Sequence, residues 1–296
     1  MDRYWRGTAF VLISAVSYGF MPIFARFAYE SGFGVPELLL LRFALAFVVM
    51  GSFLRVIGKG LSTTKKQLLV LLALGGIGYF VLSSLYYVSL LYISVPVQAL
   101  IFYTYPVFVT TGSLALGWEK ASAPLASSLL LALVGLYLVV NPIINVVIIG
   151  FLLALGAAIT YTIYILASTR ALKGLSGEVA SFYVIGAAAL SFLIFDSLTG
   201  SVHIAWNYES WVWPILIAIV STAIAMTAFF QGIKLIGPST ASILSLTEPI
   251  TSVIAASILF NEFLNMYQWI GGLLILLATI IAAISKAKEQ KNLGRI

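Results

Sequence analysis

The segment that decides the fold runs from Gln67 to Trp118 and reads QLLVLLALGGIGYFVLSSLYYVSLLYISVPVQALIFYTYPVFVTTGSLALGW. It contains no Asp, Glu, Lys or Arg, and it is long enough for two helices of the ~20 apolar residues that cross a bilayer. Backbone groups in lipid must be hydrogen-bonded within the protein, and the segment is too uniformly apolar for barrel strands. We therefore interpret it as two successive membrane helices.

The rest of the chain shares this apolar character. Of its 296 residues, 61% are apolar and 9% are charged, whereas an ordinary soluble domain has about 45–50% and about 25%. Such a fold could not cover its surface with so few charges. This excludes a soluble enzyme and, despite the net charge of +6, a nucleic-acid-binding domain. The absence of cysteine excludes a disulfide scaffold and thiolate metal sites.

We predict an all-α membrane protein with ten transmembrane helices. Breaker clusters such as Gly34-Val35-Pro36 and Gly237-Pro238 separate the apolar segments. The expected spans are 7–28, 35–57, 67–91, 94–117, 122–141, 146–170, 179–199, 211–235, 238–260 and 267–285.

The basic residues predict the orientation. With the N-terminus inside, 14 of the 16 Lys and Arg residues fall on the cytoplasmic side, and Arg26 and Arg42 are the exceptions. The 14 are Arg3, Arg6, Arg55, Lys59, Lys65, Lys66, Lys120, Arg170, Lys173, Lys234, Lys286, Lys288, Lys291 and Arg295. Because cytoplasmic loops collect Lys and Arg, we expect a multi-pass protein of the inner or plasma membrane with both termini in the cytoplasm.

The chain repeats itself at a constant offset of 143 residues. The matching pairs include Gly7 and Gly150, Tyr18 and Tyr161, Ile93 and Ile236, Thr104 and Thr247, Pro106 and Pro249, and Glu119 and Glu262. The predicted halves, 1–144 and 145–296, hold five spans each, so the second must enter the membrane from the opposite side. An inverted repeat of this kind is characteristic of secondary transporters.

These motifs resemble a known family. The chain is similar to ten-helix, EamA-type members of the drug/metabolite transporter superfamily. The resemblance is carried by Leu41-Arg42-Phe43, Tyr105-Pro106, Gly117-Trp118-Glu119-Lys120, Thr247-Glu248-Pro249, Asn261-Glu262 and Gln268-Trp269-Ile270-Gly271-Gly272. It implies export of amino acids or related small metabolites, whereas composition indicates neither substrate nor direction.

Polar and aromatic side chains recur on single faces of several spans. The candidate substrate-binding residues are Tyr18, Arg42, Tyr79, Ser83, Tyr86, Gln98, Phe102, Tyr105, Tyr161, Tyr164, Met226, Phe229, Ser245 and Glu248. A Tyr hydroxyl in lipid lacks a partner, so these residues should face a polar cavity or another helix. Each alone is also compatible with packing. Together they predict an amphipathic cavity with few fixed charges, suited to amino acids better than to polyanions.

Two charged residues lie inside expected spans. Glu248 lies near the middle of span nine, where a charge costs ~2.5–3.5 kcal/mol on insertion scales. It could carry a proton or contact the substrate, or it could be a hydrogen-bonded carboxyl beside the backbone gap made by Pro249. Arg42 could reach the outer interface or hold a substrate carboxylate. The family resemblance adds a fixed contact between helices as an option for Arg42.

Glu119 and Glu262 are symmetry mates that each end one span just before the next. They could cap the following helix or lock a loop. A gating role is the alternative.

Catalysis and cofactors find no support in the sequence. The chain has one histidine, His203, and shows no nucleophile–base pair and no Gly-rich Lys-Ser/Thr phosphate loop. We therefore expect no enzyme activity, no cofactor, no metal, no nucleic-acid partner and no direct use of ATP. The predicted protein is a secondary active transporter that works by alternating access. Its partners would be a small-molecule substrate, the lipid bilayer and, as a candidate coupling ion, protons. The alternative is an uncoupled facilitator or channel.

Overall fold

The computed structural model describes residues 3–140, 147–200, 208–260 and 264–293, and this part of the chain contains helices and no strand. The first half comprises α1 (Arg3–Gly19), α2 (Met21–Glu30), α3 (Val35–Val56), α4 (Lys65–Ala73), the π-helix η1 (Leu74–Tyr79), α5 (Phe80–Ser89), α6 (Val95–Phe102), α7 (Tyr105–Ala115) and α8 (Ala123–Val140). The second comprises α9 (Ile148–Ala171), α10 (Gly177–Thr199), the 3-10 helix η2 (Tyr208–Trp211), α11 (Val212–Ala218), the π-helix η3 (Ile219–Ile224), α12 (Ala225–Ile236), α13 (Pro238–Leu244), α14 (Thr247–Phe260) and α15 (Met266–Leu293).

Nine helical segments in the described ranges are long and apolar enough to cross a membrane. The fourth expected span, 94–117, is not among them, and in the structure it consists of α6 and α7, of 8 and 11 residues. The count of ten is reached when these two helices together form one crossing. The all-helical membrane fold is confirmed, and the structure adds a break within the fourth expected span.

The helix break has the same construction in both halves. Pro106 and Pro249 lack an N–H donor, so the carbonyls of Phe102 and Ser245, four residues earlier, lose their usual helical partner, and the neighbouring carbonyls accept side-chain hydrogen bonds. The hydroxyl of Thr104 donates to the carbonyl of Ile101 at 2.6 Å, and the hydroxyl of Thr247 donates to that of Leu244 at 2.8 Å. Side-chain donors of this kind are what permits a broken helix at membrane depth. The Thr-x-Pro repeat in the sequence therefore encodes a paired break in α6–α7 and α13–α14.

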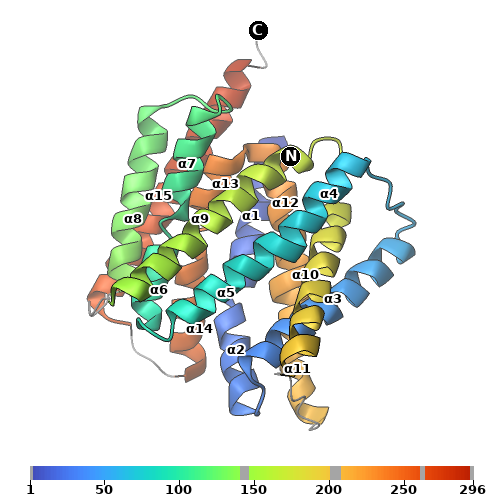
Figure 1. Cartoon of the computed structure of the whole chain (residues 1–296). Coiled ribbons are helices and arrows are strands. Elements are labelled where there is room, and N and C mark those ends of the chain that lie inside the picture. Colours follow the sequence, from blue (N-terminus) through green and yellow to red (C-terminus); the bar gives the residue numbers. More distant parts are fainter. Residues whose placement is uncertain (1–2, 141–146, 201–207, 261–263, 294–296) are drawn as a thin grey trace.

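The helices pack in pairs that are preserved when the two halves are exchanged. The pairing of α1 with α12 has its counterpart in α9 with α5, while α3 pairs with α10 and α8 with α15. Figure 1 shows α8 and α15 at one edge of the bundle and α3 and α10 at the opposite edge. The two halves thus interleave across one bundle.

Two glycines make the equivalent close contact in each half. A Cβ atom at Gly7 would lie 2.6 Å from Cγ2 of Ile236, and one at Gly150 would lie 2.8 Å from Cγ2 of Ile93. Both distances are too short for a real side chain. Only glycine therefore permits this helix approach at either place.

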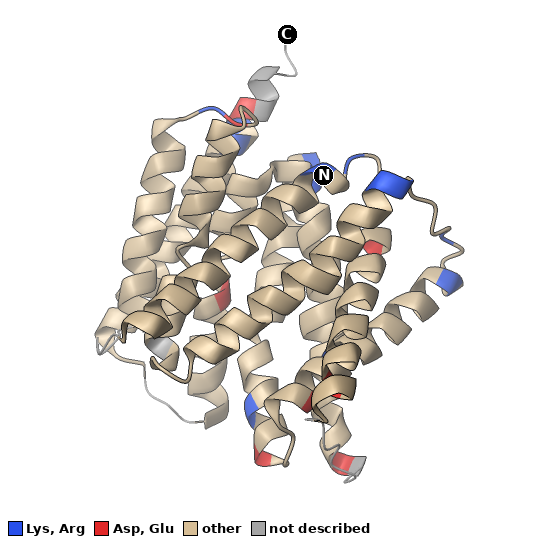
Figure 2. Cartoon of the chain, in the orientation of Figure 1, with Lys and Arg blue, Asp and Glu red and all other residues tan. Residues whose placement is uncertain are grey.

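The two ends of the bundle differ in charge. Figure 2 shows Lys and Arg gathered at the end where both termini lie, which we call the basic end. Helix α1 starts at this end with Arg3, whereas α9 finishes there with Arg170 in its last turn. The first helices of the two halves therefore run in opposite directions, as an inverted repeat requires.

Candidate functional site

A cavity of about 100 Å³ lies at the centre of the bundle, beside the breaks between α1 and α2 and between α6 and α7. Its lining consists of Tyr18, Met21, Arg42, Tyr79, Leu82, Ser83, Tyr86, Tyr87, Phe102, Tyr103, Tyr161 and Glu248. Arg42 and Glu248 are the two charged residues in this lining. Tyrosines supply most of the remaining polar atoms, so the cavity combines aromatic faces with one cationic and one carboxyl group.

Arg42 is fixed by the second half of the chain. Its Nε donates to Oγ1 of Thr222 at 2.8 Å, and its Nη2 donates to the carbonyl of Ser221 at 3.3 Å. The residue is 6% exposed, and its guanidinium lies 5.0 Å from the ring centroid of Phe43. Of the alternatives for Arg42, the fixed contact between helices is therefore present. Arg42 also lines the cavity, so a ligand in the cavity can still contact it while these hydrogen bonds are in place.

Each of the two π-helices offers one main-chain carbonyl to a side chain of the other half. In a π-helix the i→i+5 pattern changes the hydrogen-bond register, and such segments are common at functional sites. Ser221, the third residue of η3, accepts from Arg42; Gly76, the third residue of η1, accepts from the Ser191 hydroxyl at 2.8 Å. The second span of each half, α3 or α10, thus supplies a donor to the π-helix of the other half. In one half that donor is the cation of the cavity.

Glu248 follows the break between α13 and α14 as the second residue of α14. Its carboxyl group lies close to the hydroxyl of Tyr103, which lines the same cavity, and within electrostatic range of Arg42. The side chain faces the central cavity rather than lipid. The paired or cavity-facing arrangement expected for a carboxyl at this depth is therefore present.

An aromatic cluster forms one wall of the cavity. Phe102 stacks on Tyr161 with ring centroids 5.6 Å apart, and Tyr86 meets the edge of Phe102 at 5.3 Å. On the other side, Phe43 and Tyr164 meet the edge of Tyr79 at 5.1 and 5.5 Å. Edge and stacked contacts of this kind fix ring positions. The wall is consequently a shaped surface with hydroxyl groups at defined places.

The structure brings eight of the expected site residues into the cavity lining: Tyr18, Arg42, Tyr79, Ser83, Tyr86, Phe102, Tyr161 and Glu248. Tyr105 and Tyr164 form a second layer, since Tyr105 packs against the edge of Tyr161 at 4.7 Å. The hydroxyl of Ser245 donates within its own helix to the carbonyl of Ala241 at 2.9 Å. These three residues support the wall instead of lining it.

Three other expected residues lie away from the cavity lining. Met226 and Phe229 are 1% and 3% exposed in α12, the helix that packs against α1. Gln98 is fully buried in α6, which packs against α8 and α9, and its amide atoms have no hydrogen-bond partner among the described residues. A helix face can be identified from spacing, but the neighbouring helix that covers it cannot.

Sequence reasoning missed Met21, Leu82 and Tyr103 and left Tyr87 out of the site. Tyr103 lies in the two-residue break between α6 and α7, and the break directs it toward Glu248. The available signal was Pro106, three residues later, which disfavours an unbroken helix there. Met21 similarly follows the break between α1 and α2.

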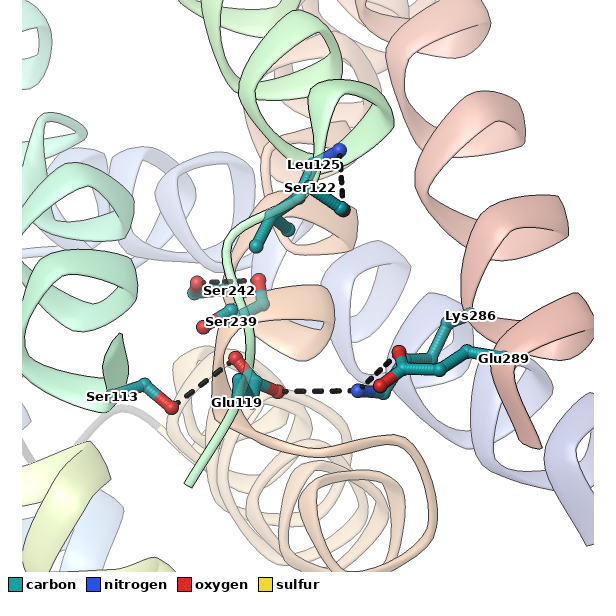
Figure 3. Close-up of polar contacts among 8 residues, drawn as sticks. All are labelled: Ser113, Glu119, Ser122, Leu125, Ser239, Ser242, Lys286 and Glu289. Atoms are coloured by element: carbon teal, nitrogen blue, oxygen red, sulfur yellow. Dashed lines mark hydrogen bonds and ion pairs between the residues drawn. The ribbon is translucent and has the colours of Figure 1, made fainter. Parts of the chain in front are cut away.

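Glu119 joins three segments at the basic end, as Figure 3 shows. Its Oε2 accepts from the Ser113 hydroxyl at 3.1 Å, and its Oε1 lies 3.8 Å from Nζ of Lys286 on α15. A Cβ atom at Gly237, where φ is +83°, would lie 2.6 Å from Oε1. The start of α8 is capped separately, because the Leu125 amide donates to the Ser122 hydroxyl. Glu119 thus locks a loop and does not cap the following helix. Its symmetry mate Glu262, like His203, lies outside the described residues.

The sequence pattern of the EamA-like transporter family matches residues 5–141 and again residues 148–284. The chain belongs to the EamA-like transporter family. The two matches lie 143 residues apart, the same offset as the repeat found from the sequence, and the membership places the chain in the drug/metabolite transporter superfamily.

Relatives of this EamA-like chain carry transporter names. An uncharacterized transporter of Archaeoglobus fulgidus is 29% identical over 93% of this chain and 96% of its own length. The uncharacterized transporter YcbK of Bacillus subtilis is 24% identical over 90% of this chain and 88% of its own length. A shorter match, 33% identical over 24% of this chain and 22% of the relative, is to solute carrier family 35 member B1 of Xenopus laevis.

A solved crystal structure has the same fold as this chain. It aligns with a TM-score of 0.81 over 95% of this chain and 98% of its own, at 18% identity. The architecture of this EamA-like protein therefore matches that of a solved structure.

Proposed function

We propose that this EamA-like protein is a secondary active exporter of amino acids or related amphipathic metabolites. The observation that carries the proposal is the presence of Arg42 and Glu248 in one small aromatic cavity. A guanidinium binds a carboxylate well, and a carboxyl group suits an ammonium group. The two charges of an amino-acid zwitterion would therefore each find a partner, while the tyrosine wall would contact the side chain.

The cavity volume supports a small substrate. At about 100 Å³, the cavity lies below the ~300–1,000 Å³ of sites for drug-sized ligands. A polyanion would meet Glu248 as well as Arg42 and would be repelled by the carboxylate.

Alternating access is supported by the way the basic end is closed. Every residue of α13, on the basic side of the second break, is buried. The Glu119–Lys286 ion pair spans the same end. We assign the basic end to the cytoplasm on the charge bias, which gives a protein of the inner or plasma membrane that is closed to the cytoplasm in this conformation. Opening would require these contacts to separate, which makes Glu119, and by symmetry Glu262, gating residues.

Coupling is assigned to Glu248. Its carboxyl group can exchange a proton as the cavity changes sides, with the Tyr103 hydroxyl as partner. Proton movement against substrate movement would then drive export, with no need for ATP.

The test is counterflow in proteoliposomes. Vesicles preloaded with one unlabelled amino acid are given a trace of the same labelled compound outside, for each of several zwitterionic, anionic and cationic classes. We expect transient accumulation for zwitterionic substrates and its loss in Arg42→Gln. Flux that follows the gradient without counterflow would instead establish the uncoupled channel, and counterflow without any pH-driven transport would establish the uncoupled facilitator. Absence of accumulation for every zwitterion would contradict the substrate class.

A further inference from the structure

A second and larger space lies on the side of the bundle between α1, α3, η3 and α12. This side crevice has a volume of about 300 Å³. It is lined by Phe10, Ile13, Val49, Met50, Phe53, Glu178, Ile219, Ala223, Ile224, Thr227, Ala228 and Gln231. Most of these side chains are apolar, and the crevice is separate from the central cavity, with which it shares no lining residue.

The side crevice has the depth of one membrane leaflet. Along η3 and α12 its lining extends from Ile219 to Gln231, a length of about 18 Å at ~1.5 Å per residue. The hydrocarbon core is ~30 Å thick, so one leaflet measures about 15 Å. Ile13 and Phe53 on its rim are 49% and 46% exposed, which places the opening on the outer face of the helices. An acyl chain is the occupant that the bilayer supplies at this place.

Positive charge surrounds the end of the crevice nearest the basic end. Arg6 precedes the lining residue Phe10 by one turn of α1, and Lys234 follows the lining residue Gln231 by one turn of α12. Lys59 pairs with Glu178 at 3.0 Å.

These charges act on one another. Lys234 lies within electrostatic range of Arg3, Lys59 and Glu178, and its ammonium donates to the carbonyl of Leu175, which leaves its charge in place. Four cations therefore face one carboxylate. We call Arg3, Arg6, Lys59, Lys234 and Glu178 the basic mouth.

We propose that the side crevice binds one anionic phospholipid of the leaflet on the basic side. One acyl chain fills the crevice, and the phosphate lies at the basic mouth. Basic pockets at the ends of membrane helices attract anionic headgroups, and long basic side chains can reach the interface while their stems cover apolar surface. A zwitterionic lipid would gain the apolar contacts without the electrostatic ones.

The bound chain would contact the segment that positions Arg42. Within η3, Ile219, Ala223 and Ile224 line the crevice, whereas Ser221 and Thr222 bond Arg42. The lipid thus packs against the back of the π-helix whose other residues hold the cation of the central cavity.

The experiment measures lipid retention on the full-length protein by native mass spectrometry. Protein in detergent is titrated with phosphatidylglycerol or phosphatidylcholine of the same acyl composition. The charge variant is Arg3→Gln with Arg6→Gln, both exposed residues. Its matched control is Lys65→Gln with Lys66→Gln, which removes the same charge from exposed positions at the same end. Each basic residue near an anionic lipid contributes roughly fivefold in affinity, so we expect about ten- to thirtyfold weaker retention of phosphatidylglycerol in the charge variant alone.

A second variant tests the binding of the acyl chain in the apolar crevice. Ala228→Phe places a ring in the crevice, and we expect it to reduce retention of both lipids while the protein stays monodisperse. Equal retention of the two lipids by the wild type, or equal loss in the charge variant and its control, would overturn the proposal. If Ala228→Phe retains lipid as the wild type does but transports less solute, the crevice is a lateral entrance for solute. That result would also overturn the lipid-binding proposal. If Ala228→Phe does not fold, the charge variant and its control still decide.

Discussion

Nε of Arg42 lies 2.8 Å from Oγ1 of Thr222, a residue 180 positions later in the chain. Thr222 belongs to η3, and its own hydroxyl donates to the carbonyl of Ile217 at 2.9 Å. The cation contributed by the first repeat is thus oriented by a π-helix of the second. Each half of the protein therefore depends on the other for the geometry of the central cavity.

Thr222→Val should weaken substrate binding without unfolding the protein. Valine has the shape of threonine but cannot accept the Arg42 hydrogen bond, and bonds to charged groups contribute ~1.5–3 kcal/mol. We expect the apparent substrate affinity in counterflow to fall about tenfold, because the guanidinium loses its fixed position. Thr279→Val is the matched control, since Thr279 is buried in α15 and bonds within that helix. An equal effect of the two substitutions would contradict a positioning role for Thr222.

The charged and tyrosine residues of the cavity could be predicted from the sequence for a physical reason. Lipid penalises Arg42, Glu248 and unpartnered tyrosine hydroxyls, so their presence inside apolar spans already indicated a shared interior. The same penalty does not apply to Met226 or Phe229. Their burial against α1 could not be distinguished from exposure to a cavity by spacing alone.

The helix breaks and π-helices were the harder part of the fold. Pro106 and Pro249 indicated a local disturbance, but the local geometry of each break also includes a threonine hydroxyl that donates to the carbonyl of Ile101 or Leu244. The π-helices have no comparable signal, because nothing in the local sequence marks the shifted hydrogen bonds of η1 and η3. Tyr103 was missed because its direction follows from the break between α6 and α7, and Pro106 alone does not indicate which residues form that break.

Gly7→Ala and Gly150→Ala should each destabilise the protein, and by similar amounts. The added methyl would collide with Ile236 or Ile93, and overpacking of this kind costs about 1–3 kcal/mol. Gly60→Ala is the control, because a Cβ atom there meets nothing within 4 Å. Thermal unfolding followed by size-exclusion fluorescence in detergent measures the difference. If Gly7→Ala and Gly150→Ala lower the stability by clearly different amounts, the two contacts are not energetically equivalent.

Lys286→Met should open the basic end more often. It removes the ion pair with Glu119 at 3.8 Å and the ion pair of Lys286 with Glu289 at 3.0 Å, while the Glu119 carboxylate keeps its hydrogen bond from Ser113. We expect faster exchange of substrate from the cytoplasmic side and greater accessibility of a cysteine placed at Thr240, since Thr240 is 2% exposed and lies beside this pair. Lys288→Met, at an exposed position on the same helix, is the control. Unchanged labelling of the Thr240 cysteine would leave Glu119 as a loop lock without a gating role.

The orientation can be tested directly because the chain has no cysteine. Single substitutions Ser62→Cys, at the basic end, and Glu30→Cys, at the opposite end, are both exposed. An impermeant maleimide added to intact cells should label Glu30→Cys and spare Ser62→Cys until the cells are opened. The reverse result would reverse the assignment of the basic end to the cytoplasm.

Glu248→Gln should separate exchange from net transport. The amide resembles the protonated carboxyl group and retains an oxygen that can accept from Tyr103. Exchange of substrate for substrate needs no net proton movement and should survive, whereas transport driven by a pH gradient should be lost. Counterflow and pH-driven flux in the same proteoliposome preparation measure the two activities.

Glu30→Gln, which changes an exposed carboxylate paired with Arg26, is the control and should retain both activities. Full pH-driven transport in Glu248→Gln would remove this carboxyl group from the coupling step. Loss of both activities with normal yield and monodispersity would assign Glu248 to substrate binding, and comparison with Arg42→Gln would then test whether the two residues hold opposite ends of one substrate.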